Sequence, residues 1–207
     1  MTSTAPALPA PGFDDPARDA QRAFRAVLDA LARPATGVPL AGPARPPTAL
    51  GPGLAALALT LLDTDCTVWL GGALADDAAT TTWLDFHTGA RRTADPAAAG
   101  FLITPPAALP PLEALEQGTD EAPHLSATVI LDVRGCAGPD RFTASGPGVN
   151  GTAELPAPWA TDGFASDWAR NAARFPRGVD LLLADAAEVT GLPRSTRLSP
   201  LAPGQED

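Results

Sequence analysis

The stretch FPRGVDLLLADAAEVTGLPRST, residues 175–196, decides the fold of this chain. Its apolar run, Val179 followed by Leu181–Leu183, predicts a β-strand because it is short and rich in aliphatic residues. Asp185–Ala187 predicts a tight turn, and Val189–Leu192 predicts a second short strand. Pro193 ends that strand, since proline has no N–H to donate to a neighbour. The stretch therefore predicts two strands joined by a turn.

A helix is predicted near the start, in the segment GFDDPARDAQRAFRAVLDALARP. Asp14 or Asp15 can cap this helix, and Pro16 fits its first turn, where a missing N–H costs nothing. An apolar stripe at helical spacing follows and ends before Pro34; we expect it to face the core. It consists of Ala20, Phe24, Val27, Leu28 and Leu31. The opposite, polar face is either solvated or a contact surface for a partner; it carries Arg18, Asp19, Arg22, Arg25 and Asp29.

Helical and extended patterns alternate through the rest of the chain. Further helices are predicted at 54–62, 75–86, 109–117 and about 159–174. Further strands are predicted at 67–70, 100–103, 128–133, 141–144 and 152–155. These elements predict an α/β fold with three layers and a mixed sheet.

Length and composition suit one compact domain. A chain of 207 residues, 45% of them hydrophobic, can fill a sizeable core. We expect a flexible tail at 1–12, the single domain at 13–198 and a C-terminal tail at 199–207. Residues 1–12 lack the basic start and apolar centre of a signal peptide, and no apolar run reaches the roughly 18 residues of a membrane span. We therefore predict a soluble, cytoplasmic protein.

Charge and basic residues exclude several classes of function. A formal net charge of −10 disfavours general binding to nucleic acid or to anionic membranes, since both attract positive surfaces. All fourteen residues in the Lys+Arg count are arginines, and the sequence contains no lysine. Pyridoxal phosphate enzymes hold their cofactor as a Schiff base on a lysine amine. The chain therefore cannot bind that cofactor in this way.

Cysteines and histidines do not predict a metal centre. Cys66 and Cys136 are far apart and form no CxxC pair, so we expect two reduced thiols, too few for an iron-sulfur cluster. A zinc site would have to bring both cysteines together with His87 and His124 from four distant places. The more ordinary interpretation is that His87 lies at the end of its helix, where a cation meets the negative end of the dipole. We assign no metal ligand and no cofactor.

No sequence motif marks a catalytic residue. Gly146-Pro147-Gly148 leads toward a strand, whereas a phosphate loop needs a helix directly after its glycines, so we expect a turn. Asp63-Thr64-Asp65 also predicts a turn rather than a metal site. No GxSxG motif identifies a nucleophilic serine. We assign no catalytic residue.

Arginines are stronger candidates for a binding role, because a guanidinium holds carboxylates and phosphates through paired, planar hydrogen bonds. Arg177, Arg194 and Arg197 bracket the decisive stretch. In one interpretation, Arg194 and Arg197 form a small anion pocket with the two hydroxyls between them. In the other, Arg177 pairs with Asp180, and the other two hold nearby backbone or the acids of a partner. Both interpretations remain open at this point.

Segments throughout the chain resemble one protein family, in the family's order. Besides the two stretches already quoted, these are LTLLDTDCTVWL at 59–70, LDFHT at 84–88, LEALEQGT at 112–119 and SATVILDV at 126–133. The ordered set covers nearly all of the chain after residue 12. It resembles PhnH, the H subunit of the bacterial carbon-phosphorus lyase system. The sequence departs from the family at Ala35, where glycine is usual.

The resemblance implies a subunit of a complex rather than a freestanding enzyme. The family is similar in fold to the large domain of pyridoxal-phosphate-dependent transferases, so the missing lysine implies a scaffold without that chemistry. The assembly forms ribose 1-phosphonate 5-triphosphate from ATP and a phosphonate. This chain would be an accessory or structural subunit, a homodimer that contacts the G, I and J subunits. It would bind no cofactor itself, and ATP would be a substrate of the complex.

The resemblance also gives weight to particular contact residues. The family's DAQxxFR pattern includes Gln21 and Arg25, and its FHT piece includes His87. The full set of possible partner or anion contacts is Gln21, Arg25, His87, Arg177, Asp180, Arg194 and Arg197. Two alternatives remain: the chain itself binds a nucleotide or phosphonate through its arginines, or it is a freestanding dimer that binds a phosphorylated metabolite.

Overall fold

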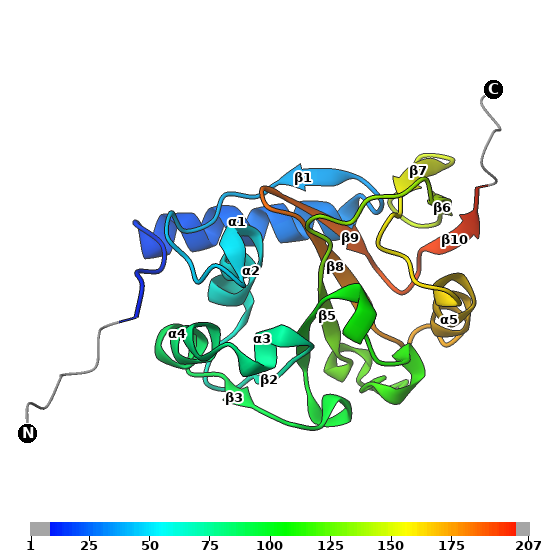
Figure 1. Cartoon of the computed structure of the whole chain (residues 1–207). Helices are drawn as coiled ribbons and strands as arrows, with labels where there is room; N and C mark the ends of the chain where they lie inside the picture. Colours follow the sequence, from blue (N-terminus) through cyan, green and yellow to red (C-terminus); the bar gives the residue numbers. More distant parts are fainter. Residues whose placement is uncertain (1–8, 202–207) are drawn as a thin grey trace, which may run out of the picture.

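A seven-stranded mixed sheet runs through the molecule, with the strand order β1-β9-β8-β5-β4-β2-β3 (Figure 1). The strands are β1 (Gly37–Pro39), β2 (Thr67–Leu70), β3 (Arg91–Arg92), β4 (Phe101–Thr104), β5 (Thr128–Asp132), β8 (Asp180–Ala184) and β9 (Glu188–Leu192). The five strands from β3 to β8 are parallel, whereas β9 is antiparallel to both β8 and β1. The computed structural model describes residues 9–201, so the predicted tails at 1–8 and 202–207 lie outside the described residues.

Helices and a second, small sheet cover the two faces of the large sheet. α1 (Pro16–Ala32), α2 (Gly51–Leu61) and α4 (Ala78–Thr88) pack on one face. α5 (Phe164–Ala172) packs on the other face together with an antiparallel sheet of order β10-β6-β7. The small sheet consists of β6 (Arg141–Ser145), β7 (Ala153–Pro156) and β10 (Arg197–Pro200). The predicted α/β architecture with a mixed sheet and three layers is confirmed.

Alternating side chains of the central strands produce two apolar cores. Ile130 and Leu182 join the core under α1, α2 and α4, whereas Val129 and Leu181 join the core under α5 and the small sheet. All four side chains are at most 1% exposed. Parallel strands covered on both faces have this nearly continuous apolar character. This explains why the run at 179–183 is detectable in the sequence.

The expectation that the whole apolar stripe of α1 faces the core is wrong in part. Val27 is buried, but Phe24 is 47% exposed and Leu28 is 51% exposed. The buried positions of α1 are otherwise alanines, and the backbone of the helix lies close to β9. A Cβ atom at Gly191 of β9 would stand 2.5 Å from the carbonyl oxygen of Ala30. Because the two backbones approach so closely, only small side chains fit between them, and the larger ones lie outside. The polar face of the helix is exposed, apart from a partly buried Asp19, as expected.

The helix predicted at 75–86 is two helices, α3 (Ala73–Asp76) and α4. Asp77 separates them: its backbone is extended, and its side chain accepts a hydrogen bond from the N–H of Thr80. Asp77 is therefore an N-cap, which starts a new helix. Hydrogen bonding with the side chain and the backbone of Thr80 lowers the pKa of the Asp77 carboxyl.

The helix predicted at 109–117 is wrong. The segment contains only a 3₁₀ turn, Leu112–Ala114. Two prolines precede this turn, and other hydrogen bonds replace helical ones. The N–H of Leu112 donates to Asp167 of α5, and within the segment the Gln117 side chain donates to the carbonyls of Leu112 and Leu115. The last predicted helix, at 159–174, is shorter, because α5 begins only after Gly163, which has a φ of +85°.

Three short strands at sheet edges were not predicted: β1, β3 and β10. These strands are short and mostly exposed, so no apolar run marks them in the sequence. β10 continues to Pro200, so it includes the first two residues of the segment that we assigned to the C-terminal tail. The turn before β1 contains Ala35, with a φ of +61°, the left-handed conformation that glycine adopts most easily. No helix among residues 9–201 is long and apolar enough to cross a membrane.

Candidate functional site

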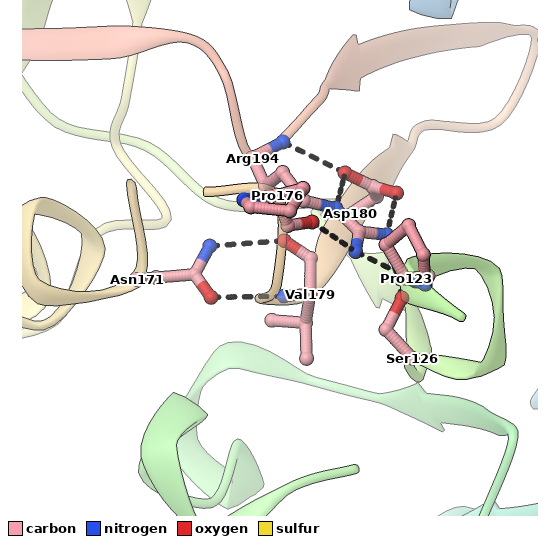
Figure 2. Close-up of polar contacts among 7 residues, drawn as sticks. All are labelled: Pro123, Ser126, Asn171, Pro176, Val179, Asp180 and Arg194. Atoms are coloured by element: carbon pink, nitrogen blue, oxygen red, sulfur yellow. Dashed lines mark hydrogen bonds and ion pairs between the residues drawn. The ribbon is translucent and has the colours of Figure 1, made fainter. Parts of the chain in front are cut away.

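Arg194 and Asp180 form the most extensive ion-pair network in the part of the chain that the structure describes, and both were predicted as contact residues (Figure 2). Asp180 is the first residue of β8, and Arg194 follows the end of β9. Because β8 and β9 pair as an antiparallel hairpin, these two ends meet at the amino edge of the parallel strands. The two side chains are mostly buried, with 12% exposed for Arg194 and 25% for Asp180.

Every N–H donor of the Arg194 guanidinium has an acceptor within the chain. Nε donates to Asp180 Oδ1 at 3.1 Å, and Nη2 donates to Asp180 Oδ2 and to Ser126 Oγ, each at 2.5 Å. Nη1 donates to two backbone carbonyls, those of Pro123 at 2.9 Å and Pro176 at 3.2 Å. A guanidinium has five N–H groups, so these five hydrogen bonds use them all. Arg194 has no donor left for a phosphate or a phosphonate.

This network connects three segments that are distant in sequence. Arg194 links the turn of Pro123 and Ser126, the loop of Pro176, and the start of β8 (Figure 2). The backbone N–H of Arg194 adds a further bond to Asp180 Oδ1, at 2.7 Å. The geometry is therefore that of a structural clamp. The predicted anion pocket of Arg194 and Arg197 is wrong, because Arg194 is fully used and Arg197 is exposed on β10.

Asn171 also holds the backbone at the start of β8. Its side chain is 3% exposed and forms two hydrogen bonds with the backbone of Val179: Nδ2 donates to the carbonyl, and Oδ1 accepts from the N–H, both at 2.9 Å (Figure 2). An asparagine amide can thus replace a neighbouring strand for one residue. Sequence analysis missed Asn171, and also Ser126, because an isolated polar residue has no spacing that distinguishes it.

The predicted pairing of Arg177 with Asp180 is wrong. Arg177 Nε lies 3.3 Å from Oδ1 of Asp120, and both side chains are largely exposed, at 49% and 69%. Asp180 is occupied by Arg194 instead, since the hairpin brings those two together while Arg177 lies in the loop before β8. Arg177 is therefore a surface residue with a weak partner, which leaves it accessible to another protein.

Three other predicted contact residues lie on α1 and α4, on the face of the large sheet away from α5 and the small sheet. Gln21 and Arg25 are exposed on α1. Among the described residues, no carboxylate lies within ion-pair distance of Arg25. His87 lies in the last turn of α4, where its Nε2 is 2.9 Å from the carbonyl oxygen of Ala10. The structure does not bring these residues together with Arg177 or Arg194.

The carboxyl edge of the parallel strands, where α/β sheets commonly bind ligands, also carries an arginine that is paired within the chain. Arg134, just after β5, donates Nε and Nη2 to the two oxygens of Asp132, at 2.7 and 2.8 Å, and Nη2 also reaches the carbonyl of Ala49. The hydrogen bonds to Asp132 raise the pKa of Arg134. Like Arg194, this arginine holds the fold together.

A cavity of about 220 Å³ opens beside this edge, between the large and small sheets. Its walls include Cys136, Trp159, Asp185 and Glu188. Pockets for small molecules typically measure roughly 300–1,000 Å³. The two carboxylates would also repel a phosphate or a triphosphate. This cavity therefore does not suit the anions that the sequence analysis considered.

Both cysteines are free, as predicted, and the structure shows that both are partly buried. Burial raises the pKa of the Cys136 thiol, and the nearby carboxylates Asp132 and Asp185 raise it further. Burial likewise raises the pKa of Cys66, whose Sγ donates to Asp63 Oδ1 at 3.2 Å. Neither thiol is activated as a nucleophile, since a reactive cysteine needs a lowered pKa. Residues 9–201 contain no group of three His, Cys, Asp or Glu side chains arranged to hold a metal ion.

The two remaining motifs are turns. Asp63 Oδ1 accepts a hydrogen bond from the N–H of Asp65, and this fixes the turn before β2. Gly148 has a φ of +83° and packs against the carbonyl oxygen of Ala32, and the N–H of Val149 donates to the carbonyl of Gly146. Both outcomes confirm the predictions made from the sequence.

Fold and site together define a class of protein: an α/β domain with a mixed sheet, in which the two most buried ion pairs hold distant segments together. The profile of the bacterial phosphonate metabolism protein family, PhnH, matches residues 11–199. The chain belongs to this family, which confirms the resemblance found in the sequence.

Two known proteins are similar to this chain over most of its length. The chain is 39% identical over 187 residues to the alpha-D-ribose 1-methylphosphonate 5-triphosphate synthase subunit PhnH of Rhizobium meliloti (strain 1021), a match that covers 90% of this chain and 93% of the relative. It is 31% identical over 180 residues to the putative C-P lyase subunit protein HtxG of Stutzerimonas stutzeri, with 86% and 85% covered.

Proposed function

We propose that this chain is an accessory, non-catalytic subunit of the carbon-phosphorus lyase core complex in organic phosphonate catabolism. In this role it supports the formation of ribose 1-phosphonate 5-triphosphate from ATP and a phosphonate, and it binds no cofactor itself. Membership of the PhnH family and the names of both relatives as subunits support the proposal.

One observation carries the non-catalytic part of the proposal: the hydrogen-bonding capacity of Arg194 is exhausted by the chain itself. A substrate phosphate would have to displace Asp180 or a backbone carbonyl, and would leave that group buried without a partner. The Asp132–Arg134 pair presents the same obstacle at the opposite edge. Neither of these two arginines is therefore free to bind an anion of the substrate.

We further infer that the chain is cytoplasmic, forms a homodimer and contacts the G, I and J subunits. The domain is also proposed to share the fold of the large domain of pyridoxal-phosphate-dependent transferases. A scaffold of that kind without lysine would keep the architecture and lack the cofactor. Exposed arginines, Arg25 and Arg177 among them, are available for contacts with the acids of a partner.

Co-expression with the G, I and J subunits tests the proposal. The chain should co-elute with them in size-exclusion chromatography. Arg25→Ala and Arg177→Ala should reduce co-elution while the isolated variants keep the wild-type melting temperature, because both side chains lie on the surface. Unchanged co-elution of both variants would remove these arginines from the interface, and a chain that always elutes alone would contradict the proposed function.

The alternative, in which the chain itself binds a nucleotide, has one observation in its favour. A cavity of about 360 Å³ lies at the carboxyl end of β2, where Trp69 and Arg92 are among its lining residues. Arg92, however, is paired in two hydrogen bonds with Asp85. Calorimetric titration of the isolated chain with ATP distinguishes the two functions: the subunit function predicts no heat of binding, and saturable micromolar binding would favour the alternative.

A further inference from the structure

The cavity between the large and small sheets is enclosed by segments that are distant in sequence. Its volume is about 220 Å³. The turn before β1, the segment after β5, the end of β7 and the β8–β9 hairpin all contribute to its walls. It lies at the carboxyl edge of the parallel strands, the place where α/β proteins commonly bind ligands. Its position is therefore that of a binding site, and the chemistry of its walls defines the ligand.

Two carboxylates of the wall have no cation bound to them. In the part of the chain that the structure describes, neither Asp185 nor Glu188 forms an ion pair. Asp185 accepts one hydrogen bond, from the N–H of the adjacent Ala186 at 2.7 Å. Arg134 is close enough to interact with Asp185 through space, but its guanidinium is bonded to both oxygens of Asp132. Three carboxylates and one guanidinium thus meet here, so the cavity keeps a negative charge.

The position of Glu188 depends on a glycine. A Cβ atom at Gly37 of β1 would overlap with the carboxylate of Glu188, so this carboxylate lies directly on the bare backbone of β1. Glu188 stands opposite Pro39 in the β1–β9 pair, and its side chain reaches Gly37 diagonally. Both Gly37 and Glu188 line the cavity. The carboxylate therefore extends along the cavity wall.

The rest of the wall suits the organic part of a ligand. Trp159 is 5% exposed, and its indole lines the cavity. Aromatic rings attract cations to their faces. Val133, Leu155 and Leu183 add aliphatic surface. A metal ion such as Ca²⁺ takes about six to eight oxygen ligands, and residues 9–201 contain no group of three His, Cys, Asp or Glu side chains that could hold one. The wall therefore favours an organic cation over a metal ion.

We propose that this cavity binds a small organic cation, an ammonium or guanidinium group on a short alkyl chain, between the carboxylates of Asp185 and Glu188. A guanidinium presents several N–H donors in one plane, which matches carboxylate acceptors. The volume of about 220 Å³ limits the ligand to a few non-hydrogen atoms, because pockets for larger molecules start at roughly 300 Å³. The cation is either a free small molecule or the tip of a lysine or arginine side chain of another protein. This inference does not rest on the proposed function.

Ethylguanidinium is the probe for the site, and N-ethylurea is the control ligand, since it has nearly the same shape and no charge. Chemical shifts of the backbone N–H groups of the isotope-labelled chain report where each compound binds. Ethylguanidinium should shift the signals of Asp185, Glu188 and Thr190 saturably, with a dissociation constant of about 1 mM or less. Added salt should weaken this binding, because it screens the charges. N-ethylurea should cause no saturable shift.

Glu188→Gln tests the role of the carboxylate, because it removes one charge and keeps the size of the side chain. It should weaken binding of ethylguanidinium at least about tenfold, since hydrogen bonds to a charged acceptor are stronger than those to a neutral one. Glu121→Gln is the matched control: it makes the same change in an exposed side chain outside the cavity and should leave the dissociation constant unchanged. Circular dichroism melting verifies that both variants are folded.

Co-elution of Glu188→Gln with the other subunits distinguishes the two sources of the cation. If the variant loses both ethylguanidinium and the subunits, the natural ligand is a side chain of a subunit; if it loses ethylguanidinium alone, the ligand is a free small molecule. Both results support the site. The absence of a saturable shift with ethylguanidinium, equal binding of N-ethylurea, or unchanged binding by Glu188→Gln would overturn the inference. None of these three results affects the subunit function, which co-elution of the wild type tests separately.

Discussion

Replacing Arg194 by alanine should destabilise the isolated protein strongly. The change removes five hydrogen bonds and leaves Asp180 with only the backbone N–H of residue 194. Breaking a fully buried ion pair on one side costs about 3–5 kcal/mol. Because 25% of the Asp180 side chain is exposed and water can partly replace the lost bonds, we expect a loss of about 2–4 kcal/mol in the free energy of unfolding.

Urea unfolding followed by tryptophan fluorescence measures this loss. Trp168 is a suitable reporter because it is buried and its Nε1 donates to the carbonyl of Thr196, close to the network. With a urea dependence of about 2–3 kcal/mol per molar, the midpoint should fall by about 1 M. Arg177→Ala is the control, since its exposed pair with Asp120 should contribute less than about 1 kcal/mol.

The reasoning would be refuted if Arg194→Ala left the midpoint unchanged while it abolished binding of ATP or a phosphonate to the chain. That combination would mean that the guanidinium serves a ligand. If Arg194 has a structural role, Arg194→Ala lowers the stability of the protein and causes no defect in ligand binding.

Three further predictions concern local packing and the thiols. Asn171→Ala should cost about 2–4 kcal/mol in thermal or urea unfolding, because two buried backbone groups lose their partners; a cost below 1 kcal/mol would contradict this. Gly191→Ala should lower the free energy of unfolding by about 1–3 kcal/mol, since the added Cβ would force α1 away from β9. Gly138→Ala is the control and should have little effect, because its Cβ would have no atom closer than 3.6 Å. Equal effects of the two changes would disprove the close approach of α1 and β9. Alkylation of Cys66 and Cys136 by iodoacetamide at pH 8 should be slower in the folded than in the unfolded protein, because a raised pKa leaves less thiolate. Peptide mass spectrometry measures the two rates. Equal rates in the folded and the unfolded protein would argue against the raised pKa.

Most of the sheet could be predicted from the sequence, because its central strands are buried on both faces. The apolar runs at 128–133 and 179–183 have no competing interpretation as surface helices, and both are strands. The edge strands β1, β3 and β10 could not be predicted. Their pairing depends on where the rest of the chain brings them, not on their own residues.

The errors on α1 and on the segment at 109–117 have a common cause. Helical spacing shows which residues share a side, but not which side the fold covers, so Phe24 and Leu28 were assigned to the core although they lie outside it. At 109–117, local helix propensity was outweighed by the hydrogen bond that the N–H of Leu112 donates to Asp167, a residue far away in the sequence. In both cases tertiary contacts decided the result.

The site shows the same limit. Sequence reasoning selected Arg194 and Asp180 as important but could not show that they bond to each other. That contact depends on the register of the β8–β9 hairpin, in which Leu181 stands opposite Leu192. Asn171 left no sequence signal at all, although it fixes the start of β8. Residue type directed attention to Arg194 and Asp180, and strand register determined that they bond to each other.

The most direct test of the central claim is to tag this chain in its own cells, grow them on methylphosphonate as the sole phosphorus source, and identify the co-purifying proteins by mass spectrometry. We predict recovery of the G, I and J subunits of the carbon-phosphorus lyase complex. Recovery of this chain alone under these conditions would contradict its role as a subunit and would favour a freestanding binding protein.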